Sequence, residues 1–369
     1  MKNKKKIGIL ITNLTGGGAE KLIIDLANKW TISYHVDILL IDKRGDFLSS
    51  VNDNINIIDL DSRNIRNAII PLRKQLKKND YDVLWVNMYP LTIIACIASL
   101  FISIDLFFTD HNNLNKSLSK KQRWIASFLI NIFYRFSRGN SVVSKGLIKE
   151  LTTLSKLNRS YFKTIYNPSA VGHKPIINTD KKITQIWGKE SCLKLLAVGK
   201  LKEVKNHMML LKAINALKEK NLRLIIVGEG ELRGQLQEYI DNNNINHLVK
   251  LFGFTKDVTT FYNSADIFVH TSLWEGFGNV IVEALEFGLP VITTDAPYGP
   301  REILDNGKYG TLISLNNHIE LSEQILHHQE NLSHYKNKNF IQDQISRSSF
   351  FSIEKISNQY LEWFELKTK

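Results

Sequence analysis

The 369-residue chain has little cysteine, which bounds its class before any motif is considered. Its two cysteines, Cys96 and Cys192, lie among apolar neighbours, and neither belongs to a set of metal ligands. A reduced, cytoplasmic protein is therefore favoured over a disulfide framework. Hydrophobic residues make up 43% and charged residues 23% of the chain, which is typical of a globular protein and disfavours disorder.

The chain also lacks a clear export signal or membrane span. The start, MKNKKKIGILITN, is basic but has only a short apolar run, which indicates a first strand. The longest apolar stretch, residues 91–108, contains Asp105 and is interrupted by Ser103. It therefore predicts a buried helix followed by a buried strand rather than a transmembrane helix.

Acidic residues are scarce in the first half of the chain. Residues 1–170 contain 25 Lys and Arg against 13 Asp and Glu, whereas residues 171–369 contain 23 of each, so the net charge of +12 belongs to the first half. This asymmetry indicates an anionic partner for that half, which could be nucleic acid, an acidic membrane surface or a phosphorylated acceptor, unless the charge merely solvates the surface. Nucleic acid is disfavoured because no recognised binding module accompanies the charge.

A basic and aromatic segment, residues 116–138, lies within that half. It fits a membrane-surface helix and a core helix with basic ends equally well. The basic residues are Lys116, Lys120, Lys121, Arg123, Arg135 and Arg138, and the large apolar ones are Trp124, Phe128, Ile132 and Phe136.

Short apolar strands alternate with helices along the chain, which predicts the α/β class with mostly parallel sheets covered on both faces. The rhythm runs to about Ile165, restarts at Leu193 and so predicts two doubly wound, Rossmann-like domains. A polar segment from Pro168 to Ser191 is the expected linker. The predicted strands lie at 6–13, 35–42, 54–61, 82–88, 105–111, 140–144, 163–167, 193–199, 222–228, 249–254, 266–272, 290–295 and 310–314.

The most informative motif is WEGFGNVIVEALE, residues 274–286, between a predicted strand and a predicted helix. Gly276 and Gly278 allow a tight turn, and the N–H groups at the start of the helix form an anion site. Glu283 lies one turn into the helix and leans back toward that site, where a carboxylate suits a ribose diol. Glu275 follows the strand and faces the crevice in which α/β sheets bind ligands.

The stretch EGFGNVIVEAL resembles the signature of the retaining glycosyltransferases of family 4, which have the GT-B fold of two Rossmann-like domains facing a central cleft. The resemblance implies an acceptor-binding domain at 1–170, a nucleotide-sugar-binding domain at 171–350, and a terminal helix at 351–369 that crosses back to the first domain. It also implies that Glu275 contacts the donor sugar and Glu283 the ribose. The donor loop between them holds Gly276, Phe277, Gly278 and Asn279.

Other candidates follow other strands. The cluster Gly16-Gly17-Gly18 opens the first helix, and the resemblance implies that Gly17 and Gly18 face the donor diphosphate. It is an incomplete dinucleotide fingerprint, because Lys21 replaces its third glycine, although Asp42 could still bind a ribose. An NAD-dependent Rossmann enzyme therefore remains an alternative.

Lys200 and Lys205 lie where cations could neutralise a leaving nucleoside diphosphate in place of a metal ion. Lys205 is the safer candidate, because the family usually has an arginine fork at the position of Lys200. His111 ends a strand of the first domain, and the resemblance implies that it contacts the donor sugar near the reacting carbon. His111, Glu275 and Lys205 are the predicted catalytic residues.

The remaining donor candidates are Gly228, Phe254, Thr255 and Glu302. Gly228 lies in a strand-to-helix turn, and the resemblance implies that Phe254 and Thr255 face the nucleobase and that Glu302 contacts the donor. Tyr298-Gly299-Pro300 departs from the paired glycines of many members and is similar to members that build bacterial surface glycans. The motif Asp59-Leu60-Asp61 is interpreted as a strand terminus rather than a metal site.

The sequence thus predicts a metal-independent, retaining glycosyltransferase at the cytoplasmic face of the inner membrane, bound through its basic first domain. It would move a hexose or N-acetylhexosamine from a UDP-sugar to a lipid-diphosphate-linked glycan in lipopolysaccharide, O-antigen or capsule assembly. No residue is a convincing covalent nucleophile, so front-face displacement is expected. A nucleotide-sugar epimerase of GT-B-like architecture and a non-catalytic glycan- or membrane-binding module are further alternatives.

Overall fold

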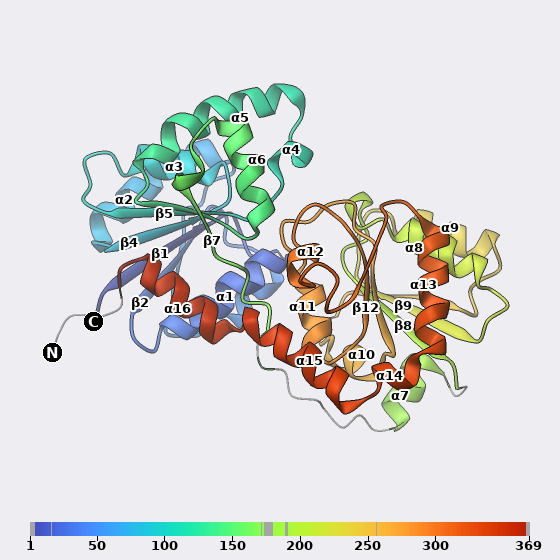
Figure 1. Cartoon of the computed structure of the whole chain (residues 1–369). Helices are drawn as coiled ribbons and strands as arrows, with labels where there is room; N and C mark the ends of the chain where they lie inside the picture. Colours follow the sequence, from blue (N-terminus) through green and yellow to red (C-terminus); the bar gives the residue numbers. More distant parts are fainter. Residues whose placement is uncertain are drawn as a thin grey trace. The chain divides into compact units, whose positions relative to one another are not determined.

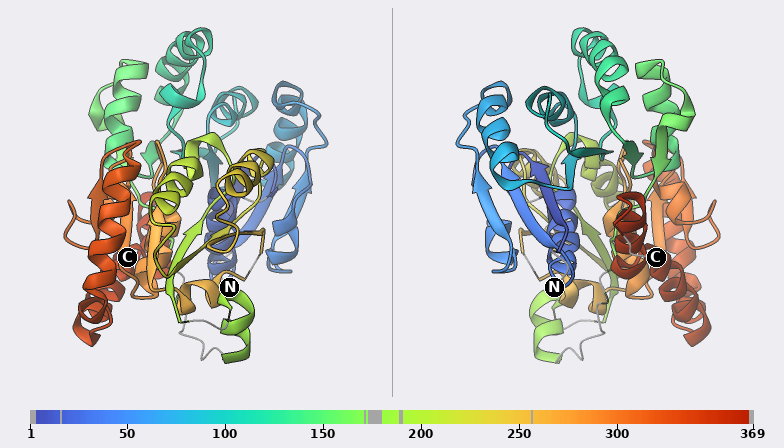
Figure 2. Two further views of the ribbon diagram at one scale, coloured as in Figure 1. Left: turned by 90° about the vertical axis from the view of Figure 1, so that its right-hand side faces the viewer. Right: turned by 90° about the vertical axis from the view of Figure 1, so that its left-hand side faces the viewer.

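A computed structural model describes residues 4–15, 17–170, 172, 180–188, 191–255 and 257–366, with the backbone alone at 180–183. The chain divides into two compact units, residues 1–168 with 353–369 and residues 169–352. In each unit a parallel β-sheet carries helices on both faces (Figure 1, Figure 2). Gly16 and residues 171, 173–179, 189 and 190 of the polar segment expected as a linker lie outside the described residues.

The first unit is built on a sheet of seven strands in the order β3-β2-β1-β4-β5-β6-β7, and every neighbouring pair is parallel. Continuous apolar runs form these strands because helices bury both faces. In β1, for example, Ile7, Ile9, Leu10 and Ile11 are completely buried. The strands are β1 (Lys6–Ile11), β2 (His35–Leu40), β3 (Asn56–Asp59), β4 (Val83–Asn87), β5 (Asp105–Asp110), β6 (Gly139–Val142) and β7 (Phe162–Thr164).

The helices of the first unit include one from the far end of the sequence. The last helix, α16, packs against α1, and its Tyr360 ring lies 4.8 Å from the Trp85 ring, centroid to centroid. Trp30 of α1 donates a hydrogen bond to Ser357 Oγ at 2.9 Å. The helices are α1 (Gly18–Trp30), α2 (Ile69–Asn79), α3 (Leu91–Ala98), α4 (Leu114–Ser117), α5 (Lys120–Phe133), α6 (Lys145–Ser155) and α16 (Ile353–Trp363).

The second unit has a six-stranded parallel sheet in the order β10-β9-β8-β11-β12-β13. Its strands are β8 (Leu193–Val198), β9 (Leu222–Val227), β10 (Val249–Gly253), β11 (Ile267–His270), β12 (Val291–Thr294) and β13 (Thr311–Ile313). Its helices are α7 (Asp180–Trp187), α8 (His207–Ala216), α9 (Arg233–Asn242), α10 (Thr259–Ser264), α11 (Asn279–Glu286), α12 (Pro300–Ile303), α13 (His318–Glu330), α14 (Leu332–Tyr335) and α15 (Lys338–Ser348).

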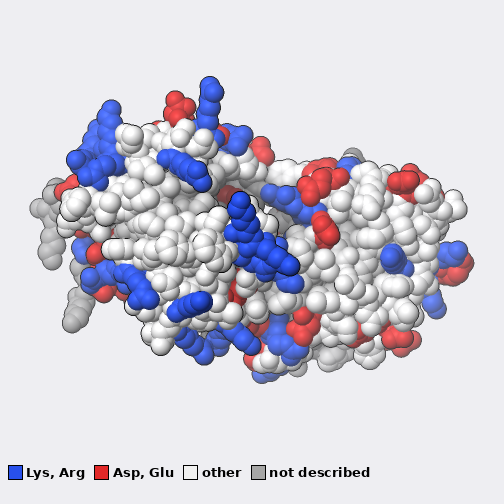
Figure 3. Space-filling model, turned by 90° about the horizontal axis from the view of Figure 1, so that it is seen from above, with Lys and Arg blue, Asp and Glu red and all other residues white. Residues whose placement is uncertain are grey.

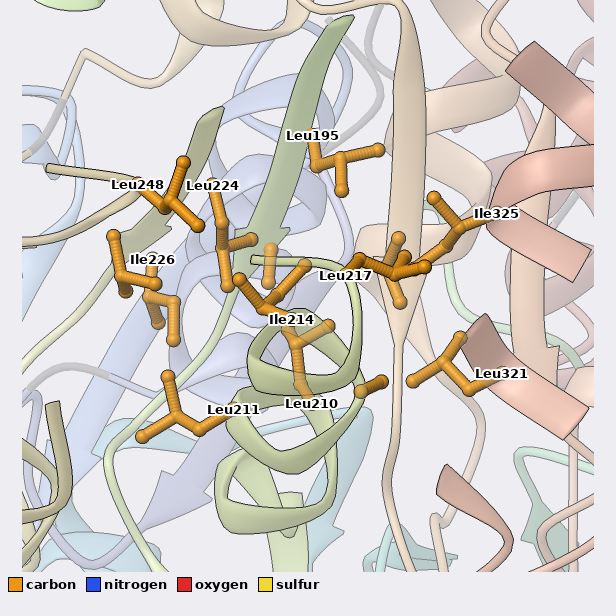
Figure 4. Packing of buried hydrophobic residues seen from close by; sticks show 14 of the residues in the cluster. Leu195, Leu210, Leu211, Ile214, Leu217, Leu224, Ile226, Leu248, Leu321 and Ile325 are labelled. Carbon is orange, nitrogen blue, oxygen red and sulfur yellow. The ribbon is translucent and has the colours of Figure 1, made fainter. Parts of the chain in front are cut away.

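Aliphatic side chains fill the space between this second sheet and its helices. Leu224 and Ile226 of β9 belong to one buried cluster with Leu210 and Ile214 of α8 (Figure 4). Leu321 and Ile325 of α13 complete the same core. Such a core fixes where each strand ends, and therefore where the loops that follow the strands begin.

In both sheets the strand order reverses once, between β1 and β4 in the first and between β8 and β11 in the second. Loops at the carboxyl ends of the strands on either side of such a point bound the ligand crevice of α/β folds. Every predicted strand overlaps an observed one, so the predicted α/β class with two doubly wound sheets is confirmed.

Two further sequence-based interpretations concern single segments. The apolar stretch 91–108 forms α3 and β5, and among the described residues no helix is long and apolar enough to cross a membrane. The motif Asp59-Leu60-Asp61 ends strand β3, where Asp59 Oδ1 accepts hydrogen bonds from the backbone N–H groups of Lys43 at 3.3 Å and Asp61 at 2.9 Å.

Candidate functional site

The loops after β8 and β11 bring Lys205 and Glu275 together, although they are seventy residues apart. Lys205 ends the short 3-10 helix η5 (Glu203–Lys205), and Glu275 lies between β11 and α11. Because β8 and β11 are neighbours at the reversal point, their loops meet at the same edge of the sheet. The Lys205 ammonium donates to Glu275 Oε1 at 2.5 Å, and the side chains are only 21% and 13% exposed.

Two residues that the sequence analysis did not single out also bond to this carboxylate. His270 Nε2 lies 2.9 Å from Glu275 Oε1, and Ser272 Oγ donates to the same oxygen at 2.7 Å. The other ring nitrogen of His270 lies 2.9 Å from Thr293 Oγ1 in β12. The available signal was the polar run His270-Thr271-Ser272 at the carboxyl end of a buried strand.

These contacts keep the Glu275 carboxylate charged. Burial alone would raise the pKa of Glu275, but the Lys205 charge and the His270 hydrogen bond outweigh burial and hold that pKa well below its usual range. Burial lowers the pKa of His270, opposed by Glu275. Burial, with the nearby Lys205 charge, also lowers the pKa of His207 to about 4. The site therefore holds a fixed anionic acceptor beside one cation and neutral imidazoles.

The backbone of Glu275 is fixed by the segment that departs from the family pattern. Glu275 N–H donates to Pro297 O at 2.9 Å, and Tyr298 N–H donates to Glu275 O at 3.0 Å. Gly299 has φ of 101°, and a Cβ there would clash with the backbone of Phe277. The glycine thus lets the two loops pack backbone to backbone.

The start of α11 provides a positive helix end beside this carboxylate. Gly278, with φ of 110°, is the N-cap, and no side chain caps the helix. Gly276 is half-buried in the same turn, and Phe277 is buried against Phe351, with ring centroids 5.4 Å apart. Asn279, the first helical residue, accepts a hydrogen bond from Ser169 Oγ at 3.0 Å through Oδ1. The partial charge of the helix terminus favours an anion there.

Glu283, one turn into α11, is held by a buried tyrosine that the sequence analysis missed. Tyr262 of α10 donates from its hydroxyl to Glu283 Oε2 at 2.9 Å. The Tyr262 ring stacks on Phe287, with centroids 5.3 Å apart and planes 8° apart. Burial, with the nearby Glu283 charge, raises the pKa of Tyr262 well above its usual value. Tyr262 thus remains a hydrogen-bond donor to the carboxylate.

Two family models match the chain and together span most of it. The model described as glycosyl transferases group 1 matches residues 179–342, and the model described as Glycosyltransferase Family 4 matches residues 16–169. The chain belongs to this glycosyltransferase family. The predicted family and enzyme class are therefore confirmed, and the epimerase, NAD-dependent and non-catalytic alternatives are wrong.

Two relatives and one solved structure resemble this glycosyltransferase over nearly its full length. In Campylobacter jejuni, N-acetylgalactosamine-N,N'-diacetylbacillosaminyl-diphospho-undecaprenol 4-alpha-N-acetylgalactosaminyltransferase is 26% identical, with 85% of this chain and 87% of that protein covered. GalNAc-alpha-(1->4)-GalNAc-alpha-(1->3)-diNAcBac-PP-undecaprenol alpha-1,4-N-acetyl-D-galactosaminyltransferase, also of C. jejuni, is 24% identical, covering 96% and 97%. The structure of Anabaena Alr3699/HepE in complex with UDP-glucose superposes with a TM-score of 0.83 at 21% identity, covering 98% and 99%.

The other candidates in the second unit of the glycosyltransferase lie in loops at the same sheet edge. Lys200 is exposed after β8, in contrast to the half-buried Lys205. Gly228 packs on the Gly199 backbone, where a Cβ would clash, and donates to Gly253 O at 2.9 Å. Phe254 is 54% exposed after β10, and Thr255 Oγ1 accepts from Asp257 N–H at 3.2 Å.

Glu302 lies in α12, one turn after Gly299. Its backbone carbonyl accepts a hydrogen bond from Arg347 Nη2 at 2.5 Å, and Arg347 Nε donates to the next carbonyl, that of Ile303, at 2.6 Å. Arg347 therefore ties α12 to α15.

In the first unit, His111 follows β5 and is buried. Its Nε2 lies 3.0 Å from Asn87 Oδ1, at the end of the neighbouring β4. Burial lowers the pKa of His111 to about 4, opposed by a hydrogen bond with Asn167. The imidazole is therefore neutral near pH 7 and suited to hydrogen bonding.

Gly17 and Gly18 open α1, as predicted. Gly17 is the N-cap, and a Cβ there would clash with the Glu20 carboxylate, which packs against the bare Cα. Because that carboxylate is the end of a flexible side chain and Gly17 has an extended backbone with φ of −136°, the local structure does not by itself require glycine there. Asp42, the ribose candidate of the NAD-dependent alternative, instead forms an ion pair with Arg44 at 2.7 Å.

Proposed function

We propose that this glycosyltransferase is a retaining enzyme that moves a hexose or N-acetylhexosamine from a UDP-sugar to a lipid-diphosphate-linked glycan. The observation that carries the proposal is the Lys205–Glu275 ion pair, 2.5 Å long and mostly buried, beside the uncapped N-terminus of α11. A cation and a helix terminus suit the donor diphosphate, and a fixed carboxylate suits the hydroxyls of a sugar.

Within this proposal, the residues around the start of α11 and the neighbouring Lys205 bind different parts of the donor. Lys205, Gly278 and Asn279 hold the diphosphate, Glu283 accepts from the ribose hydroxyls, and Glu275 accepts from the donor sugar. The Tyr262 hydroxyl donates a hydrogen bond to Oε2 of Glu283 and so orients the carboxylate. The other donor contacts proposed are Gly17, Gly18, Lys200, Gly228, Phe254, Thr255, Gly276, Phe277 and Glu302.

Catalysis is proposed to rest on stabilising the leaving UDP rather than on a covalent intermediate. Lys205 and the α11 dipole neutralise the developing diphosphate charge without a metal ion. The departing diphosphate assists attack of the acceptor hydroxyl on the same face, which gives an α-linked product from an α-linked donor. His111, neutral because burial lowers its pKa to about 4, contributes a hydrogen bond to the donor sugar.

The donor nucleotide and the acceptor are argued from the relatives. The names of both C. jejuni enzymes describe transfer to undecaprenol diphosphate-linked glycans, and the HepE structure holds UDP-glucose. A lipid-linked acceptor agrees with the positive charge of the first half of the chain, since both lipid surfaces and diphosphates are anionic. We therefore propose a peripheral enzyme at the cytoplasmic membrane face, in lipopolysaccharide, O-antigen or capsule assembly.

A panel of nucleotide sugars tests this function. The chain is incubated with each sugar and a short lipid-diphosphate glycan, and the product is scored by mass and by anomeric configuration. We expect transfer from UDP-sugars with an α-linkage. A β-linked product would exclude the retaining mechanism, and preference for another nucleotide would exclude the proposed donor.

A single substitution tests the assignment of Glu283. Glu283→Gln is expected to lower kcat/KM for the UDP-sugar at least about tenfold, because one charged hydrogen bond to the ribose is lost. Glu238→Gln, a matched change at an exposed position of α9, is expected to leave kcat/KM unchanged. Full activity of Glu283→Gln would refute the ribose role.

A further inference from the structure

The helix α5 buries only part of its apolar surface. Beside the buried Ala126 and Ile130, polar residues also face the neighbouring helix: Ser127 Oγ donates to Leu154 O at 2.5 Å, and Asn131 Nδ2 donates to Ser155 O at 2.7 Å. These acceptors are the last carbonyls of α6, which need partners at a helix end. With this face turned inward, several large apolar side chains are left facing outward.

The outward face of α5 and the turn after it is apolar to an unusual degree. Trp124 is 75% exposed, Phe128 60% and Phe136 65%, and Ile125 and Ile132 are exposed as well. Residues 124, 128 and 132 recur at intervals of four, so they form one stripe along the helix. A contiguous exposed stripe of this kind marks an interaction surface.

The stripe is framed by positive charge. Between Asp110 and Glu150 the sequence has eight Lys and Arg residues and no Asp or Glu. Lys120 and Lys121 begin α5, and Arg135 follows its end, all three exposed. Arg138, also exposed, forms ion pairs with Glu365 at 2.6 Å and Asp105 at 3.7 Å. Figure 3 views the molecule from the side on which α5 lies in Figure 1, and over the first unit blue Lys and Arg predominate over red Asp and Glu.

The helix is firmly held, so this exposure is not fraying. A capping box between Ser119 and Gln122 closes its first turn. Ala126 and Ile130 are completely buried on the inner face. At the far end Cys96 of α3 donates from Sγ to Phe133 O at 3.5 Å. The stripe is a preformed surface.

We propose that this α5 surface, Trp124, Ile125, Phe128, Ile132 and Phe136 with the flanking Lys120, Lys121 and Arg135, docks the enzyme on an anionic phospholipid bilayer. Fourteen residues make a helix about 21 Å long, which lies flat in the interface. The aromatic and aliphatic side chains enter the acyl boundary, and the basic side chains reach the phosphate groups.

The charge pattern favours a bilayer over a second copy of the chain. A two-fold symmetric contact between two such helices would bring basic ends against basic ends, without an acidic residue between Asp110 and Glu150 to offset them. Anionic headgroups complement both ends at once. This docking deepens the proposed function and rests on it for the lipid-linked acceptor. Binding to the bilayer itself requires neither the donor nor the acceptor.

Vesicle binding by the full-length chain tests the apolar part of the surface. We expect co-sedimentation with vesicles of phosphatidylcholine mixed with phosphatidylglycerol. Trp124→Ser with Phe128→Ser is expected to weaken the partition at least about tenfold, since two aromatic anchors are lost. Ile319→Ser, at a 60% exposed position of α13 in the second unit, is the matched control and should bind like wild type.

The charged part of the α5 surface is tested by two double variants that remove the same charge at different places. Lys120→Gln with Lys121→Gln is expected to lower binding to anionic vesicles about tenfold and to leave binding to neutral vesicles unchanged. Lys77→Gln with Lys78→Gln, the same charge change at the exposed end of α2, is expected to have little effect. Equal binding of wild type to neutral and anionic vesicles would overturn the role of these lysines.

Two further results would overturn the docking proposal. One is vesicle binding by Trp124→Ser with Phe128→Ser as strong as that of wild type. The other is a wild-type dimer in sedimentation velocity that this variant converts to a monomer, which would make the stripe a self-interface. Transfer to a short-chain, water-soluble acceptor should be unaffected by the variant. Loss of transfer by wild type itself would count against the proposed function and not against docking.

Discussion

At the residue scale, Oε1 of Glu275 is the most heavily bonded atom of the site described above. Lys205, His270 and Ser272 all lie within 2.9 Å of it. A buried carboxylate that receives several hydrogen bonds is stabilised in its charged form. We therefore regard His270 as a positioning residue that acts through Glu275, which the following variant tests.

Replacing His270 with Leu removes one hydrogen bond to Glu275, so the pKa of that carboxyl should rise toward its usual range. Because the glutamate must be ionised, the acidic limb of the kcat/KM profile should move to higher pH. Near pH 7 the glutamate stays ionised, but activity there should fall about tenfold because the carboxylate loses part of its orientation. The measurement is kcat/KM from pH 8 down to the lowest pH at which both proteins stay folded. His270→Asn, which keeps an N–H donor, should restore part of the activity, and an unmoved acidic limb would argue against positioning.

A buried carboxyl in the first unit gives a pH prediction for stability. Burial raises the pKa of Glu150 to about 7, although the N–H of Asn115 donates to Oε1 at 2.9 Å. The folded state then binds the proton more tightly than the unfolded state, so the Glu150 contribution to the free energy of unfolding falls as pH rises from about 4.5 to 7.

The Glu150→Gln variant cannot lose this proton. Its free energy of unfolding relative to wild type should therefore increase between pH 5 and pH 8, by roughly 1 to 3 kcal/mol at a slope no steeper than about 1.4 kcal/mol per pH unit. Urea unfolding at both pH values measures the difference. A difference that is the same at pH 5 and pH 8 would contradict the raised pKa.

At the element scale, the site depends on turns between strands and helices. Gly278 takes φ of 110° and lets the α11 N-terminus face the loop that carries Glu275. Gly299 and Gly228 also have positive φ. In addition, each packs its bare Cα on a neighbouring backbone carbonyl, where a Cβ would clash. These glycines set the distances between the loops at the sheet edge.

Gly278→Ala should destabilise the second unit by about 1 to 2 kcal/mol, because an L-residue is strained at this φ. It should also weaken UDP binding, measured by calorimetry, since the helix end would shift. The control is Gly234→Ala in α9, where a Cβ would meet nothing within 4 Å. There alanine should stabilise by about 0.5 to 1 kcal/mol. Equal effects of both changes on UDP binding would argue against a special role of Gly278.

At the scale of the whole molecule, the first unit is completed by the end of the chain. Phe364, 2% exposed, lies between Trp30 and Phe107, at centroid distances of 5.7 and 5.0 Å. The core of one unit thus includes residues from both termini, on either side of the second unit in sequence. The packing of this core therefore depends on residues 353–366, which follow the second unit in sequence.

Phe364→Ala should cost about 3 to 5 kcal/mol in the first unit, through lost burial and the cavity left behind. The unfolding transition of the second unit, identified as the one that UDP raises, should be unchanged. Differential scanning calorimetry with and without UDP separates the two transitions. Ile32→Ala, at a 74% exposed position of the same unit, should have little effect. A shift of the UDP-sensitive transition alone would contradict this assignment.

Local patterns were enough to predict the two parallel sheets and the strand, glycine turn and helix around Glu275 and Glu283. Strand periodicity and turn residues act over a few neighbours, so the sequence carries them directly. The roles of Tyr262 and His270 could not be predicted in this way. Each depends on a partner brought close by strand order, as Lys205 is brought to Glu275 because β8 and β11 pair.

The sequence by itself determined the α/β class, the family and the segment 116–138 with its aromatic and basic residues. It left that segment open between a core helix and a membrane-surface helix, because helical spacing shows which residues share a face but not which face packs inward. Only the tertiary structure decided which face packs inward. The free carbonyls at the end of α6 bond to Ser127 and Asn131, so Trp124 and Phe128 face outward.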